Sequence, residues 1–337
     1  MNLFARINYR LELQFVVFAQ TKEMKEKSIS RYRLSENSFF KAYQLEPKEH
    51  YIKIEKYYIN IRVLTVGKGQ PLLFIHGAPN AASTWAQLVS LVPEYRCILL
   101  DRPGCGLSGI ASYKNLSDNE LTTIIVSVID SVLDYFHIEK LPVVANSFGG
   151  YLALKYVLQK PDRISKLILE GCPAMVEGSR VPRFMKMMLA PGTRWLIPKL
   201  PTTKFIFKKI AKELGHSYSI SNNLIPEVFI DWYVSLFNNT NTQKNDISLI
   251  SKAMPAGKMN SEFILHDNEI EKIPQPTLWL WGLDDPFGGI EIGNRLNSKM
   301  KNSTIVSFEN SGHLPWIDKP ESHASIIKEF IGHKKEI

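Results

Sequence analysis

The stretch Val144–Gly150, VANSFGG, lies where an apolar strand turns directly into a helix, and it decides the fold. Leu141–Ala145 predicts a buried strand, and a helix is expected from Gly149 to about residue 159. So sharp a turn strains the backbone at Ser147 and exposes its side chain at the carboxyl edge of a sheet. Ala145 stands where the strict G-x-S-x-G pattern has a glycine. Two roles are open for Ser147: a nucleophile, or the N-cap of the helix.

Strands and helices alternate on both sides of this turn, which predicts a mostly parallel sheet with right-handed crossovers. The first two strands suit an opening hairpin. Ser117 and Glu120 form a capping box for a helix that reaches about residue 136, and a last helix is expected over 321–331. The other expected strands are 51–56, 59–66, 71–75, 95–100, 164–169, 276–281 and 303–308.

The composition is that of a soluble globular protein: 337 residues, 45% hydrophobic and 22% charged. The three cysteines have no CxxC spacing, so neither a disulfide framework nor a zinc site is expected, and a reducing cytoplasm fits best. The net charge of +8 favours anionic partners, but no nucleic-acid-binding motif accompanies it. Near the N-terminus, the apolar run Phe15–Ala19 is too short for a membrane span or a signal core.

Four regions are predicted: an N-terminal extension (1–47), a first part of the core (48–171), a helical cap (172–268) and a second part of the core (269–337). In the extension, apolar residues recur at helical spacing, from Phe4 to Phe18. This helix is expected either to pack on the body of the protein or to make a peripheral contact with a membrane surface.

The predicted cap is basic and rich in aromatic and methionine residues. From Glu177 to Lys212 there are nine Lys or Arg residues and one acid. The apolar side chains indicate a pocket for an apolar substrate. The positive charge suits either an anionic substrate or a solvated outer face, and together with the N-terminal stripe it also suits a lipid surface.

Two glycine-bearing loops follow predicted strands. His76–Asn80 can present the Ala78 N–H, together with the Phe148 N–H, to the oxyanion of an acyl-transfer reaction. We interpret His76 itself as a hydrogen-bonded structural histidine rather than a base. The loop Asp101–Ser108 is interpreted as scaffold, and Cys105 within it would be reactive only with a lowered pKa.

An acid and a histidine also follow strands in the second part of the core. Asp285 lies in WGLDDP and His313 in NSGHLPW, so both are expected at the same sheet edge as Ser147. There a histidine can take the serine proton while a carboxylate orients the imidazole. Taken singly, each also suits a plainer role, a turn aspartate before proline or a loop histidine.

Over residues 50–332 the chain resembles the α/β-hydrolase fold superfamily, in which serine, acid and histidine occur in this order. The resemblance implies an α/β-hydrolase fold with Ser147 as nucleophile, His313 as base and Asp285 as acid. Asp284 is the first alternative for the acid, and Glu170 a distant second. The oxyanion donors of the family correspond to the N–H groups of Ala78 and Phe148.

This resemblance leaves several activities open. The preferred one is hydrolysis of a small apolar ester through an acyl-enzyme, with no metal or cofactor. A hydrolase of C–C bonds in ring-fission products is the main alternative, because NSFGG is similar to elbows of both classes. Proline iminopeptidases match less well, and a non-catalytic binder on the same fold is the least favoured. Epoxide hydrolases and haloalkane dehalogenases need a carboxylate at the position of Ser147.

Overall fold

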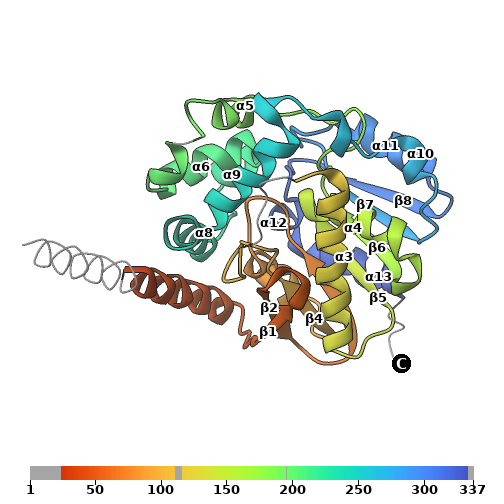
Figure 1. Ribbon diagram of the computed structural model, residues 1–337, viewed down its shortest axis with the longest axis horizontal. Helices are drawn as coiled ribbons and strands as arrows, with labels where there is room; N and C mark the ends of the chain where they lie inside the picture. The colour runs from red at the N-terminus through yellow and green to blue at the C-terminus, as the bar shows by residue number, and fades with distance from the viewer. Residues whose placement is uncertain (1–23, 111–115, 195, 333–337) are drawn as a thin grey trace, which may run out of the picture.

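The computed structural model describes residues 24–110, 116–194 and 196–332, and its centre is an eight-stranded sheet (Figure 1). The strand order is β1-β2-β4-β3-β5-β6-β7-β8. β2 is antiparallel to both β1 and β4, and the other pairs are parallel, as predicted. The strands are β1 Lys48–Ile54, β2 Ile59–Val66, β3 Gln70–Ile75, β4 Tyr95–Leu100, β5 Leu141–Asn146, β6 Ile164–Glu170, β7 Thr277–Gly282 and β8 Ser303–Phe308.

The predicted opening hairpin is confirmed, but its first strand begins three residues earlier than expected. Ile54 pairs with Ile59, so the residues between them form the turn. A short 3-10 turn, η1 (Glu55–Tyr57), and a left-handed Tyr58 (φ 51°) reverse the chain there. Lys56, which was expected in the strand, therefore belongs to the turn.

Helices cover both faces of the sheet because the buried strands are apolar on both sides. In β5, Val143 and Ala145 face one core cluster and Val144 faces the other. The first cluster includes side chains of α3 (Asp118–Tyr135), α4 (Phe148–Gln159) and α11 (Ile290–Lys299). The second includes side chains of α2 (Ala86–Ser90), α12 (Pro315–Asp318) and α13 (Pro320–Ile331). At the start of α3, the Ser117 side chain accepts a hydrogen bond from the Glu120 N–H, as the capping pattern predicts.

Along the sequence, a group of helices lies between β6 and β7, in the segment for which the sequence predicts a cap (Figure 1). We refer to this group as the cap. Its helices are α5 Arg183–Leu189, α6 Lys204–Glu213, α7 Ser217–Ser221, α8 Glu227–Asn239, α9 Thr242–Ala253 and α10 Asp267–Ile270. Side chains from the cap and from the strand ends enclose one cavity, described below.

Residues 24–42 are helical and pack against both the core and the cap. The Phe39 ring stacks on Trp232 of α8, with centroids 5.2 Å apart. Buried Arg62 of β2 bonds through Nη1 to Glu36 of this helix (3.0 Å) and to Asp101 (3.2 Å). The predicted stripe from Phe4 to Phe18 lies outside the described residues. In the described part of the chain, no helix combines the length and apolarity needed to cross a bilayer.

Candidate active site

Ser147 sits at the turn between β5 and α4, and its backbone has the strain that the sequence predicts. Its φ of 51° and ψ of −117° are rarely adopted by a residue with a side chain. The turn is so tight that a Cβ on Gly149 would lie 2.3 Å from the Ile75 carbonyl oxygen. Only glycine therefore fits at position 149, whereas the methyl group of Ala145 is accommodated in the core.

His313 and Asp285 form a buried pair at the same edge of the sheet. His313 Nδ1 lies 2.8 Å from Asp285 Oδ2. The carboxylate also accepts hydrogen bonds from the N–H groups of Cys172 (2.8 Å) and Phe287 (2.9 Å). The Phe287 ring stacks on the imidazole at 4.1 Å between centroids. These contacts hold the imidazole in one orientation, with Nδ1 toward the acid.

The other imidazole nitrogen, Nε2, lies on the far side of the ring from Asp285. His313 Nε2 is buried and has no hydrogen-bond partner among the described residues. His313 and Ser147 line the same cavity. The structure therefore brings Ser147, His313 and Asp285 to one site from three different loops.

The two alternative acids lie elsewhere. Asp284 is exposed, and no bond from its side chain to His313 occurs in the described structure. Glu170 is buried at the end of β6 and pairs with a different histidine, His323, at 2.8 Å. Of the three candidates, Asp285 is the carboxylate that contacts His313.

The predicted oxyanion donors lie beside Ser147. Phe148 is the first residue of α4, so its N–H has no acceptor within the helix. Ala78 and Gly77 line the cavity with Ser147, and a Cβ on Gly77 would lie 3.0 Å from the Ser147 Cβ. The loop after β3 thus lies directly beside Ser147.

His76 is a structural residue of that loop, as interpreted from the sequence. Its Nδ1 lies 2.7 Å from the Gly77 carbonyl oxygen, and its Nε2 accepts the Arg102 N–H at 3.1 Å. Burial, together with the Arg102 charge, holds the pKa of His76 well below its usual range. The imidazole is therefore neutral, donating through one nitrogen and accepting through the other.

Arg102, in the loop interpreted as scaffold, joins the loop after β3 to the cap. Its buried guanidinium donates to the carbonyl oxygens of His76 (3.1 Å) and Gly77 (2.8 Å) and to Asp246 of α9 (2.7 Å). It also lies 5.1 Å from the centroid of the Phe148 ring. Sequence reasoning missed this role because the partner carboxylate is 144 residues away. In the same loop, burial raises the pKa of the Cys105 thiol, so that thiol is not activated.

Two further residues that sequence reasoning missed hold the His313 loop. Asn146 donates through Nδ2 to the carbonyl oxygens of Glu170 (2.7 Å) and His313 (3.0 Å). His216 of the cap bonds through Nδ1 to Asp318 (2.8 Å), and Asp318 accepts the Gly312 N–H (2.9 Å). Asn146 directly precedes the elbow serine, so its position in the sequence is the signal for this role.

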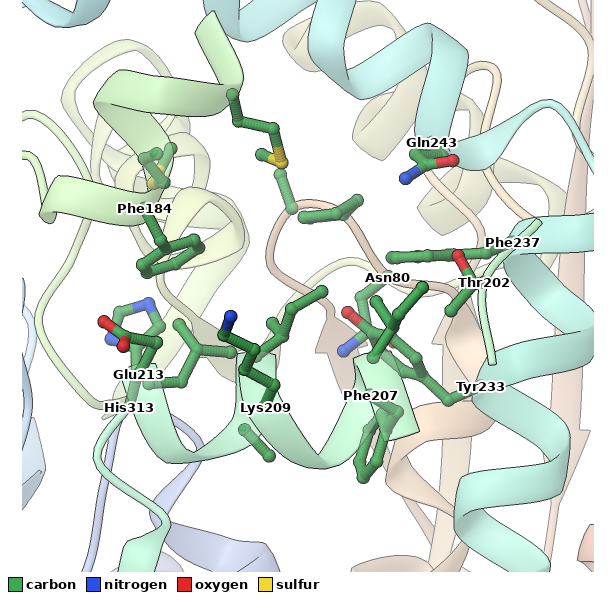
Figure 2. A pocket seen from close by; sticks show the side chains of 18 of the residues that line it. Asn80, Phe184, Thr202, Phe207, Lys209, Glu213, Tyr233, Phe237, Gln243 and His313 are labelled. Atoms are coloured by element: carbon green, nitrogen blue, oxygen red, sulfur yellow. The ribbon is translucent and has the colours of Figure 1, made fainter. Parts of the chain in front are cut away.

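The cavity has a volume of about 690 Å³ and a mostly apolar lining. This volume is within the range of small-molecule sites. Figure 2 shows Phe184 beside His313 at one end, and Tyr233, Phe237 and Gln243 at the other. Besides Asn146, Ser147 and His313, the polar residues of the lining include Arg183, Lys209 and Glu213 of the cap, with Gln243, Thr202, His216 and Asn80. No cluster of His, Cys, Asp or Glu suited to a metal ion occurs in the described ranges.

Comparisons with known proteins place this site in a known family. A 2-hydroxy-6-oxononadienedioate/2-hydroxy-6-oxononatrienedioate hydrolase of Paraburkholderia phymatum is 27% identical over 78% of this chain and 87% of its own. Epoxide hydrolase 1 of Caenorhabditis elegans is 29% identical over 83% of this chain and 69% of its own. The structure of carboxylesterase CesB from Bacillus subtilis superposes with a TM-score of 0.68 at 15% identity, covering 91% and 99% of the two chains.

The family itself is shown by a match over most of the chain. Residues 70–320 fit the model of the alpha/beta hydrolase fold family. This range contains Ser147, Asp285 and His313, and it agrees with the strand order and the elbow described above. The chain therefore belongs to the α/β-hydrolase family.

Proposed function

We propose that this protein is a serine hydrolase that cleaves carboxylic esters of small or medium apolar substrates through an acyl-enzyme. One observation carries the proposal. His313 is bonded through Nδ1 to Asp285, its Nε2 has no partner among the described residues, and it lines the same cavity as Ser147, whose backbone is strained. A serine, a base and an orienting acid in these relations are the parts that nucleophilic acyl transfer needs.

In the proposed reaction, Ser147 Oγ attacks the ester carbonyl carbon while His313 Nε2 takes the serine proton. The Ala78 and Phe148 N–H groups donate to the resulting oxyanion, and Asp285 stabilises the imidazolium. Collapse breaks the carbon–oxygen bond, and His313 gives its proton to the leaving alcohol. A water molecule, deprotonated by His313, then attacks the acyl-enzyme carbonyl, the bond to Ser147 Oγ breaks to release the acid, and His313 returns the proton to Ser147 Oγ.

The lining of the cavity supports an apolar substrate. Phe184, Phe207, Phe237 and the methionines of α5 surround the space above Ser147. An ester that fills such a pocket binds by burial of its acyl or alcohol chain, which contributes roughly 25 cal/mol per Å² removed from water.

Cleavage of a C–C bond in a ring-fission product is the second candidate. The relative from Paraburkholderia phymatum carries that kind of substrate in its name, and this name denotes a dicarboxylate. Arg183 and Lys209, which line the cavity, provide cations that suit a substrate carboxylate. Epoxide opening is not proposed, because the elbow holds Ser147 in place of the carboxylate which that reaction requires.

The decisive experiment is Ser147→Ala with p-nitrophenyl esters of increasing acyl length and a ring-fission product as substrates. We expect the wild-type protein to hydrolyse the esters and to react with a fluorophosphonate probe, and we expect the variant to do neither while it stays folded. Near wild-type turnover in the variant would exclude Ser147 as nucleophile. Turnover of the ring-fission product alone would favour the second candidate, and an unlabelled, inactive wild-type protein would indicate a binder.

A further inference from the structure

Large apolar side chains are exposed on the outer surface of the cap. Phe205 of α6 is 77% exposed and Met187 of α5 is 66% exposed. Leu196, Leu200 and Ile206, in and between these helices, are also exposed. Met187, Leu200 and Ile206 line the cavity as well. The exposed apolar surface is therefore continuous with the wall of the cavity above Ser147.

Basic side chains accompany these residues. Lys186, Lys199 and Lys212 are exposed, and none has a carboxylate within 4.0 Å in the described part of the chain. On α6, Phe205, Lys209 and Lys212 follow at steps of four and three, so they share one face of the helix. Figure 2 shows Lys209 and Glu213 on α6 beside the cavity. Glu213 is the acidic residue of this otherwise basic helix.

We propose that this surface docks the protein on an anionic membrane, with the mouth of the cavity toward the bilayer. We call it the docking face and define it by Lys186, Met187, Leu196, Lys199, Leu200, Phe205, Ile206 and Lys212. Its apolar side chains enter the headgroup region and its lysines attract anionic lipids. An apolar substrate dissolved in the bilayer then reaches Ser147 along a continuous apolar surface.

Charge complementarity favours a lipid over a second copy of this chain. The lysines of the docking face have one sign, so two such faces brought together would repel each other. An anionic bilayer satisfies the apolar and the basic residues at once. In Figure 1, α5 and α6 lie at the edge of the molecule, away from the β1–β2 hairpin.

The test is co-sedimentation of the full-length protein with vesicles. We expect binding to vesicles of phosphatidylcholine with phosphatidylglycerol, weaker binding to phosphatidylcholine alone, and loss of binding as salt increases. Each lysine at an anionic surface strengthens binding about fivefold. Lys199→Glu with Lys212→Glu should therefore weaken it at least about twenty-fivefold, and Phe205→Glu should also reduce it strongly.

Matched controls separate docking from folding and from chemistry. Tyr58→Glu changes an aromatic residue that is 87% exposed in the β1–β2 turn and should leave vesicle binding unchanged. Phe205, Lys199 and Lys212 do not line the cavity, so their variants should keep hydrolysis of a water-soluble ester. Ser147→Ala should bind vesicles like the wild type, because docking does not depend on the proposed reaction.

Three results would overturn the proposal. The wild-type protein fails to sediment with the anionic vesicles, or the docking-face variants bind as tightly as the wild type. The third result is absence of vesicle binding together with self-association in sedimentation velocity without lipid, removed by Phe205→Glu. The docking face would then be an interface between copies of this chain.

Discussion

The pairing of His313 with Asp285 predicts a sharp difference between two adjacent aspartates. Asp285→Asn keeps the size of the side chain but removes its charge, and Asp284→Asn makes the same change one residue earlier, on an exposed side chain. If Asp285 orients and stabilises the imidazolium, only the first substitution should affect catalysis.

The expected size follows from the contact itself. Asp285 Oδ2 lies 2.8 Å from His313 Nδ1, so the charge centres are about 4 Å apart. At an effective dielectric constant of about 20, two unit charges at that distance interact by about 4 kcal/mol. Since about 1.4 kcal/mol corresponds to a tenfold change in rate, kcat should fall roughly a thousandfold. This is about tenfold smaller than the loss of about ten-thousandfold known for such a change in a serine protease triad.

The free energy of unfolding of Asp285→Asn should also fall, by less than the activation free energy of the reaction rises. The carboxylate accepts three hydrogen bonds, from His313, Cys172 and Phe287. An amide has only one oxygen, so its NH₂ group must face at least one of these donors. A buried donor without an acceptor costs about 1–3 kcal/mol. Asp284→Asn should stay within about 0.5 kcal/mol of the wild type.

The assay is kcat for a p-nitrophenyl ester, combined with urea unfolding of the same preparations. A fall in kcat of less than about tenfold for Asp285→Asn would refute the electrostatic argument, given that about 4 kcal/mol is at stake. An equal fall for Asp284→Asn would also refute it, because it would show that the acid is not the residue bonded to His313.

Three further predictions rest on other contacts. Gly149→Ala should destabilise the protein by about 1–3 kcal/mol or more in urea unfolding, since its Cβ would lie 2.3 Å from a carbonyl oxygen. The control is Gly150→Ala, which should be tolerated because its Cβ would have no neighbour nearer than 3.6 Å. Arg102→Met should cost about 3–5 kcal/mol because it removes the ion-pair partner of buried Asp246, and adding Asp246→Leu should recover much of that stability. A double variant no more stable than the single one would contradict this. Burial alone would raise the pKa of Asp318, but His216 and its other donors lower it overall. Asp318 therefore stabilises the fold at pH values above its ordinary pKa of 3.8, and this contribution is lost as pH falls through the lowered pKa. Urea unfolding at several pH values should show the stability of Asp318→Asn approaching that of the wild type in acid. A difference in stability that stays constant with pH would exclude the linkage.

The strands and the elbow were accessible from the sequence because they depend on neighbours along the chain. Runs such as Leu141–Ala145 are apolar on both faces, and this pattern alone indicates a strand buried between two layers of helices. The strain at Ser147 follows from an abrupt change from strand to helix within one residue. That Asp285 and His313 follow strands was likewise readable, since the ends of parallel strands meet at one edge.

The tertiary structure decided which side chains meet there. The resemblance favoured Asp285 as the acid and left Asp284 as the alternative, and in the described structure it is Asp285 that is bonded to His313. The contacts of Arg102 with Asp246 and of Asn146 with the His313 loop join segments more than 140 residues apart. Periodicity records which face of an element is buried, but it does not record which element covers that face. Such contacts depend on how the cap and the strand-end loops cross in space, and that geometry exists only in the folded chain.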